Sequence, residues 1–230
     1  MTPDLDPPAA ASLPRLVFFD LDGTISHRDT LLPYVARYLL HHPWRLWRLA
    51  GVLPPLLGLV TGRADRGALK GELIHAVLGG ITAAEVEAWN ARSLPHLLER
   101  GLFSAARAAI DAHRRHGDHL VLMSASVDLY VPELGRQLGF DATICSGVLW
   151  HAGRLDGRLS TANCRDEEKA RQFRRISAAH PGLQTVAYAN AASDLPHMLL
   201  ATHAILVNPS PQLRQRAAGL GIESVEWRNP

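Results

Sequence analysis

The sequence contains very little cysteine. Its 230 residues include only Cys145 and Cys164. Two thiols cannot form a disulfide framework, and on their own they cannot supply a four-ligand structural zinc site. The 12 histidines lack the HExxH spacing of zinc hydrolases. We therefore expect a protein of a reducing compartment, the cytoplasm, without a zinc site.

Lysine is equally rare, because 22 of the 24 basic residues are arginine and only Lys70 and Lys169 are lysine. This preference for arginine is typical of codon bias and indicates little about function. It does make a lysine at a motif position easier to interpret as functional. The 24 basic residues face 22 acidic ones, which gives a net charge of +2. That balance excludes a nucleic-acid-binding protein that depends on bulk charge, although it is compatible with a local basic patch.

We also expect no signal peptide and no membrane-spanning helix. Residues 1–14 have neither a basic segment nor an apolar one, and we expect them to form a flexible leader. The one membrane-like segment, residues 49–60, is interrupted by Pro54, Pro55 and Gly58. Its twelve residues fall short of the roughly 20 that a membrane-spanning helix needs.

Short apolar runs separated by helical stretches predict an α/β fold. Apolar residues make up 47% of the chain and the mean hydropathy is -0.02, so a substantial core can be buried. The alternation of short apolar runs with helical stretches, such as residues 104–117 and 167–180, predicts a Rossmann-like parallel sheet. The runs that resemble buried parallel strands are residues 15–20, 119–124, 185–190, 204–208 and, less clearly, 141–145.

About a hundred residues between the first strand and His119 contain no strand-like run. Most of this stretch is helical in pattern, and Thr82–Glu85 forms a capping box ahead of one helix. The length of the chain fits one core domain with an insertion better than two full domains. The remaining segment with a clear pattern, residues 146–160, contains several glycines and predicts a β-hairpin. We expect a core of residues 15–30 and 99–230 and a helical cap of residues 31–98.

Tryptophan and arginine flank the apolar run of the cap. Residues 37–70 carry a net charge of +5, because six basic residues face Asp65 alone. Trp and Arg beside an apolar stretch suit a membrane interface. The alternative, which we favour, is a helix pair packed on the core with arginine on its solvent face. The six basic residues are Arg37, Arg45, Arg48, Arg63, Arg66 and Lys70, of which the last three are candidates for binding an anion.

The most informative stretch is FFDLDGT, residues 18–24. Asp20 and Asp22 follow the first strand, at the edge where open parallel sheets bind ligands. Gly23 permits a tight turn whose backbone N–H groups can hold an anion. Paired carboxylates would repel that anion unless a hard cation lay between them, so Mg²⁺ is expected.

With this stretch the chain resembles the haloacid-dehalogenase-like phosphohydrolases, and further motifs of that family follow in order. Ser124 ends the next core strand, Lys169 opens a later helix, and Asn190 and Asp194 stand where the family usually has an acidic pair. The resemblance covers about residues 15–221. A helical insert directly after the first motif resembles the phosphoserine-phosphatase-like branch, subfamily IB, and implies its fold.

The resemblance implies a role for each motif residue. Asp20 would attack phosphorus and form an aspartyl-phosphate, and Asp22 would act as general acid and then general base. Ser124 would donate a hydrogen bond to the phosphoryl group, and Lys169 would offset its negative charge. The substrate is expected to contact Gly23, Thr24, Ala125 and Asp29.

The metal site departs from the family's usual pattern. Mg²⁺ would be held by the Asp20 side chain, the Asp22 carbonyl and Asn190, with Asp194 nearby. An amide oxygen can bind a hard cation but brings no negative charge. We therefore expect activity with a high Mg²⁺ requirement.

Several alternatives stay open at this stage. Asp29 either meets a substrate amine, as its position resembles that in phosphoserine phosphatases, or caps the helix that begins near Thr30. The leading function is hydrolysis of a small phosphomonoester. A lipid-phosphate phosphatase at the inner membrane face is the alternative, because the cap segment resembles that of phosphatidylglycerophosphatase C and could contact anionic lipid. A third is a catalytically weak module that binds a phosphate ligand. The oligomeric state is not indicated.

Overall fold

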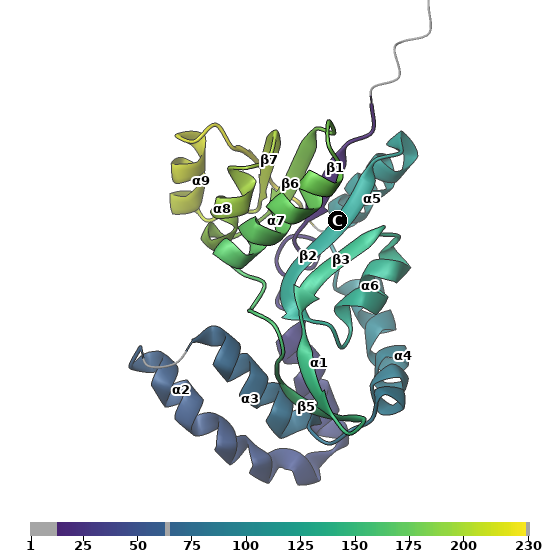
Figure 1. Cartoon of the computed structure of the whole chain (residues 1–230), viewed down its shortest axis with the longest axis vertical. Helices are drawn as coiled ribbons and strands as arrows, with labels where there is room; N and C mark the ends of the chain where they lie inside the picture. Colours follow the sequence, from purple (N-terminus) through teal and green to yellow (C-terminus); the bar gives the residue numbers. More distant parts are fainter. Residues whose placement is uncertain (1–12, 63–64, 229–230) are drawn as a thin grey trace, which may run out of the picture.

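A six-stranded parallel sheet forms the centre of the molecule in the computed structural model, which describes residues 13–62 and 65–228 (Figure 1). The strand order is β3-β2-β1-β6-β7-β8, so β1 and β6 lie in the middle. This sheet, with helices on both sides, confirms the predicted α/β class. The strands are β1 (Leu16–Phe19), β2 (His119–Val127), β3 (Ala142–Ser146), β6 (Thr185–Ala189), β7 (His203–Val207) and β8 (Glu223–Val225).

Alternate residues of β1 supply the two apolar layers of the core. Val17 and Phe19 belong to the layer covered by α5 and α6, whereas Leu16 and Phe18 belong to the layer covered by α7, α8 and α9. Both faces of β1 are buried, as expected for a central parallel strand. The covering helices are α5 (Ser104–His116), α6 (Val131–Leu138), α7 (Glu167–Ala179), α8 (Leu195–Met198) and α9 (Pro211–Ala218).

The long insert between β1 and β2 is helical, and several of its helices lie below the carboxyl end of the sheet in Figure 1. Thr82 and Glu85 form the predicted capping box at the start of one of them. The elements are α1 (Leu31–His41), the 3-10 helix η1 (Pro43–Val52), α2 (Leu53–Val60), α3 (Arg66–Leu78) and α4 (Ala83–Arg100).

The predicted hairpin forms from β4 (Val148–His151) and β5 (Arg154–Leu159), and it packs on α3 rather than on the sheet. Gly157 has φ +98°, and a Cβ atom there would run into the backbone of α3 at Ile74 and His75. Glycine therefore permits both the turn of the chain and the close approach. A segment late in the sequence thus lies against the inserted helices.

The arginines of η1 point the opposite way from our expectation. Arg45 Nη1 donates to the carbonyls of Val77 and Gly79, both at 3.0 Å, and Arg48 Nη1 donates to Gly79 at 2.9 Å. These carbonyls lie at the carboxyl end of α3, where helical C=O groups lack partners and attract cations. For Arg45 and Arg48 the predicted solvent-facing position is therefore wrong, and Trp44 and Trp47 are exposed instead. No helix within the described residues is long and apolar enough to cross a membrane.

Candidate active site

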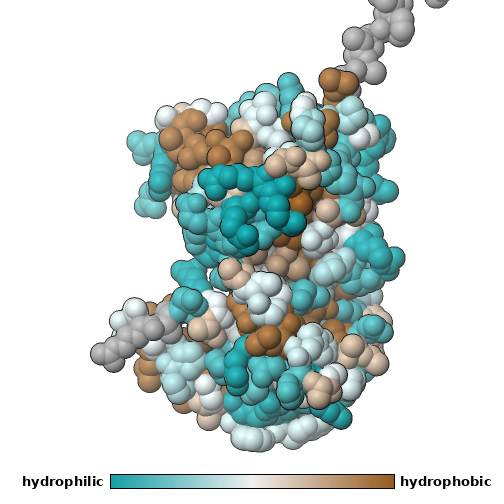
Figure 2. All heavy atoms as spheres, viewed as in Figure 1, coloured by the Kyte–Doolittle hydropathy of each residue, from teal (hydrophilic) through white to brown (hydrophobic). Residues whose placement is uncertain are grey.

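The carboxyl ends of the central strands bring the motif residues to one cavity of about 420 Å³. Asp20 and Asp22 follow β1, Asn190 follows β6, and Lys169 comes from the first turn of α7. The opposite wall comes from the inserted helices, and Figure 2 shows an indentation between the upper and lower parts of the molecule on this side. The residues on that wall include Leu32, Leu59, Arg66, Leu69, Lys70 and Leu73.

Asp20 is a buried carboxylate at the base of the cavity. Its Oδ1 lies 2.6 Å from Lys169 Nζ, and its Oδ2 accepts a hydrogen bond from Thr24 Oγ1 at 3.0 Å. Burial raises its pKa to about 7; Lys169 opposes this rise, and the nearby carboxylates of Asp194 and Asp22 add to it. Two fixed donors therefore hold the carboxylate in one orientation at the end of β1.

Lys169 is buried and connects two carboxylates. Its Nζ lies 2.7 Å from Asp194 Oδ1 in addition to its contact with Asp20. Burial alone would lower the pKa of Lys169, but Asp194 and Asp20 outweigh it and raise that pKa above its usual range. Burial alone would raise the pKa of Asp194, but the charge and hydrogen bond of Lys169, together with His197 and the Ala191 N–H, outweigh it and lower that pKa. The ammonium group is thus a permanent positive charge inside the site.

Asp22 is held by hydrogen bonds from three hydroxyl groups. Its Oδ1 accepts from Thr30 Oγ1 at 2.6 Å and from the Thr30 N–H at 2.7 Å. Its Oδ2 accepts from Ser126 Oγ at 2.8 Å and from Ser124 Oγ at 3.3 Å. Tyr130 extends this network, with its OH 2.8 Å from Thr30 Oγ1.

Gly23 and Asn190 fit against each other. Gly23 has φ +83°, and a Cβ atom there would overlap the side-chain amide of Asn190. Only glycine satisfies both conditions without strain. The tight turn after Asp22 therefore lets the β6 loop approach, which brings the Asn190 amide to the rim of the cavity with Asp20 and Asp22.

Of the residues expected to contact substrate, some line the cavity and one is buried beneath it. Ala125 and Asp29 line the cavity, whereas Thr24 is fully buried and binds Asp20. Asp29 Oδ1 also accepts the Leu32 N–H at 2.7 Å, so it stabilises the first turn of α1 as a capping residue would. Burial raises the pKa of Asp29. The two alternatives for Asp29 are thus compatible in one side chain.

The candidate anion-binding residues of the cap differ in their contacts. Lys70 Nζ donates to the Ala125 carbonyl at 2.5 Å and to Asn163 Oδ1 at 2.6 Å, so it joins α3 to the core. Burial lowers the pKa of Lys70. Arg66 lines the cavity, and Arg63 lies outside the described residues.

The sequence analysis missed two residues that hold Asp22, Ser126 and Thr30. Ser126 lies two residues after Ser124 on β2, and the period-two pattern of a strand could have identified it. Ser124 is fully buried, whereas Ser126 lines the cavity. Thr30 carries no comparable signal, because its contact with Asp22 depends on how the chain turns between β1 and α1.

The donor set of the cavity suits a hard divalent cation. The innermost groups are the carboxylates of Asp20, Asp22 and Asp194 and the ammonium of Lys169, which sum to a charge of -2. Asn190 adds an amide oxygen, and the carbonyl of Asp22 is a further candidate ligand. Among the described residues, no three His, Cys, Asp or Glu side chains converge as a metal site by themselves. A metal here would therefore depend on the amide and main-chain oxygens.

Paired aspartates, a lysine and small hydroxyl residues at the carboxyl edge of a parallel sheet are typical of a hydrolase that acts on phosphate esters. The haloacid dehalogenase-like hydrolase family model matches residues 17–199, and the chain belongs to this family. The residues quoted from the sequence for that resemblance are thus within the matched range. Phosphatases of this family generally use a divalent metal, which the donor set accommodates.

Curated relatives and solved structures agree with this assignment. A probable phosphatase of Mycobacterium tuberculosis is 28% identical over 100% of this chain and 81% of its own length. A phosphoserine phosphatase of Streptomyces coelicolor is 32% identical over 88% of this chain but only 46% of its own length. These matches place the chain among the HAD-family phosphatases of the phosphoserine-phosphatase-like type.

Two solved structures share the fold. A protein of unknown function from Bordetella pertussis superimposes with a TM-score of 0.76 at 22% identity, covering 93% of this chain and 99% of that one. A substrate-bound phosphoserine phosphatase superimposes with a TM-score of 0.66 at 18% identity, covering 95% of both chains. The likeness extends across almost the whole chain.

Proposed function

We propose that the protein hydrolyses a small phosphomonoester through an aspartyl-phosphate on Asp20. The observation that carries this proposal is the placement of Asp20, between Lys169 and Thr24 at the end of β1 and facing the cavity. Such restraint favours in-line attack by one carboxylate oxygen on phosphorus. Lys169 offsets the negative charge that builds on the phosphoryl oxygens.

Asp22 supplies and removes the proton. In the first step the Asp20 oxygen bonds to phosphorus, the ester bond breaks, and Asp22 gives its proton to the leaving oxygen. In the second step Asp22 takes a proton from water, and the water oxygen attacks phosphorus to release phosphate and free Asp20. The Ser126 hydroxyl can donate a hydrogen bond to Asp22 when Asp22 is a carboxylate and accept one when Asp22 is protonated.

We propose Mg²⁺ as the divalent metal, held by Asp20, the Asp22 carbonyl and Asn190, with Asp194 beside them. Bound there, it would reduce the repulsion between the carboxylates and the phosphate. The amide of Asn190 in place of a carboxylate lowers the negative charge of the ligand set. A high Mg²⁺ requirement follows from this.

We propose that residues 15–30 and 99–230 form a catalytic core and residues 31–98 a cap, with the cytoplasm as the location; residues 1–12 of the predicted leader lie outside the described residues. The bridge from Lys70 to Ala125 and Asn163 supports a cap that closes the cavity. Ala125, Gly23 and Asp29 would contact the substrate, and Arg66 would meet a negative group on it. The relative named phosphoserine phosphatase makes phosphoserine the first compound to test.

The test is turnover of p-nitrophenyl phosphate with Mg²⁺, followed by a screen that includes phosphoserine and phosphatidylglycerophosphate. Asp20→Asn should abolish turnover, and Arg171→Gln on the exposed side of α7 should leave it unchanged. No turnover of any phosphomonoester by the unmodified protein would reject the proposal and favour a module that only binds phosphate.

A second candidate, hydrolysis of a lipid phosphate at a membrane surface, is favoured by the exposed apolar surface of η1 and α2. Trp44 and Trp47 are 66% and 78% exposed. Residues 31–62 contain three arginines and no acidic residue. Exposed Trp and Leu on a segment of net positive charge suit an anionic membrane interface. The η1–α2 surface comprises Trp44, Leu46, Trp47, Leu53, Leu56 and Leu57.

Vesicle flotation tests this second candidate. The protein should float with phosphatidylglycerol vesicles at low salt and not with phosphatidylcholine vesicles. Replacing Trp44 and Trp47 by serine should abolish flotation, whereas Trp150→Ser on the β4 hairpin should not. Absence of flotation with anionic vesicles at low salt would reject the candidate.

A further inference from the structure

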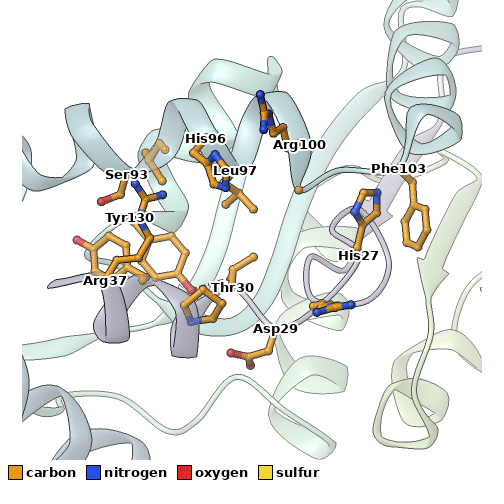
Figure 3. A pocket seen from close by; sticks show the side chains of 15 residues that line it. His27, Asp29, Thr30, Arg37, Ser93, His96, Leu97, Arg100, Phe103 and Tyr130 are labelled. Atoms are coloured by element: carbon orange, nitrogen blue, oxygen red, sulfur yellow. Dashed lines mark hydrogen bonds between the residues drawn. The ribbon is translucent and has the colours of Figure 1, made fainter. Parts of the chain in front are cut away.

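A second cavity of about 610 Å³ lies beside the catalytic one, between α1 and the carboxyl-terminal half of α4 (Figure 3). Asp29 is the only described residue that lines both cavities. The volume of this second cavity is in the range of about 300–1,000 Å³ that small-molecule sites occupy. Neither the sequence motifs nor the proposed reaction uses this cavity.

The rim of this cavity carries an excess of positive charge. Arg28, Arg37 and Arg100 line it, and the guanidinium groups of all three lack a hydrogen-bond or ion-pair partner within residues 13–62 and 65–228. Asp29 is the one carboxylate among the described lining residues, so the charge sums to +2 with histidine neutral. In Figure 3, Arg37 extends from α1, whereas Arg100 and His96 extend from α4. Cations gathered without counter-ions attract an anion into the space between them.

The inner wall of the cavity is apolar and aromatic. Tyr34 and Leu94 are buried, and Leu97 and Phe103 are partly buried. Such a wall favours a ligand with a hydrocarbon or ring body. A hydrated inorganic ion would lose water contacts there that the apolar side chains cannot replace. The combination of charged rim and apolar wall therefore selects an organic anion.

We propose that this cavity is a binding site for a small organic dianion with an apolar or aromatic body. Two negative charges match the +2 of the rim, and arginine forms paired hydrogen bonds with a carboxylate or phosphate. The site also adjoins the catalytic residues. Thr30 and Tyr130 line the cavity, and Thr30 donates two hydrogen bonds to Asp22 on its other side.

Isothermal titration with naphthalene-2,6-dicarboxylate, without metal, tests the proposal, because a carboxylate probe cannot be hydrolysed. We expect binding of the dicarboxylate and none of the neutral naphthalene-2,6-dimethanol. Arg37→Gln and Arg100→Gln should each weaken binding about tenfold, because each substitution removes a charge-assisted hydrogen bond to the dianion. Arg92→Gln removes the same charge from α4 outside the cavity and should leave the affinity unchanged.

Three results would overturn the proposal. The first is no binding of the dicarboxylate by the unmodified protein. The second is equal weakening in Arg92→Gln and Arg100→Gln, which would indicate attraction by net charge alone. The third is displacement of the probe by saturating inorganic phosphate, which would place it in the catalytic cavity. All three measurements are independent of phosphatase activity.

Discussion

At the scale of single residues, the innermost part of the catalytic cavity has a deficit of positive charge. The carboxylates of Asp20, Asp22 and Asp194 lie there with one ammonium group, that of Lys169, and burial raises the pKa of Asp20 to about 7. A divalent cation would remove this deficit. The chain has an amide, Asn190, at the position where one more carboxylate would be most effective.

Exchange of that amide tests the metal assignment. Asn190→Asp keeps the size of the side chain and adds a negative charge beside Asp20 and Asp22. We expect half-maximal activity at about tenfold lower Mg²⁺, because hard cations bind more tightly as the ligand charge increases. We also expect lower thermal stability without metal, since the added carboxylate is then unpaired. An unchanged Mg²⁺ dependence would contradict the placement of the metal.

The sequence identified Asp20, Asp22, Lys169 and Asp194 because their spacing belongs to a known family pattern. It did not identify Ser126 or Thr30, because their contribution depends on the path of the chain around Asp22. Asp22 has neighbours on β2 and at the start of α1, which are far apart in sequence. Local sequence patterns contain no information on contacts between residues that are far apart in the chain.

Ser126→Ala tests whether this second group of residues matters. Loss of the hydroxyl removes the 2.8 Å hydrogen bond to Asp22 Oδ2. We expect kcat to fall about tenfold with KM unchanged, because one hydrogen bond to a charged group contributes about 1.5–3 kcal/mol. Ser104→Ala, at the exposed start of α5, is the control. A change in KM alone would assign Ser126 to substrate binding instead.

At the scale of elements, the amino-terminal edge of the sheet is fixed by Asp118. Its buried carboxylate accepts hydrogen bonds from Arg15, His113 and His116, with the shortest contact of 2.6 Å to His113 Nδ1. Burial alone would raise the pKa of Asp118, but these hydrogen bonds lower it well below its usual range. The cluster connects the start of β1 to the end of α5.

Asp118→Ala should lower the free energy of unfolding by about 3 kcal/mol at neutral pH, because it leaves a buried charge network without its anion. A depressed pKa stabilises the folded state fully above the unfolded value, about 3.9, and less as the pH falls below it. The difference between variant and unmodified protein should therefore shrink below about pH 4. Denaturant unfolding at several pH values measures it, with Asp111→Ala on α5 as the control. Equal stability of the two variants would contradict this account.

The five longer strands of the sheet, the hairpin and the helices α5 and α7 could be predicted from the sequence, whereas β8 and the orientation of η1 could not. The apolar runs and the capping box at Thr82 correspond to observed strands and a helix start. β8 has only three residues, and it forms because β7 offers it a paired edge. The orientation of η1 depends on the carbonyls of Val77 and Gly79, which approach only in the folded chain.

At the scale of the whole molecule, the inserted helices line part of both cavities and also carry the exposed η1–α2 surface. α2 contributes Leu59 to the catalytic cavity and exposes Leu53 and Leu57 at the surface. The proposed reaction chemistry thus lies at the end of the sheet, and the proposed contacts with lipid and with an organic dianion lie mainly on the insert. This division follows from the topology, because the insert leaves the sheet directly after Asp20 and Asp22.

The measurement that tests the central claim most directly is identification of the phosphorylated residue. The protein is mixed with p-nitrophenyl phosphate and Mg²⁺, quenched in acid, and digested for mass spectrometry. We predict one phosphoryl group on the peptide that contains Asp20, and none in Asp20→Asn. Phosphorylation of another residue, or continued turnover by Asp20→Asn, would contradict the account.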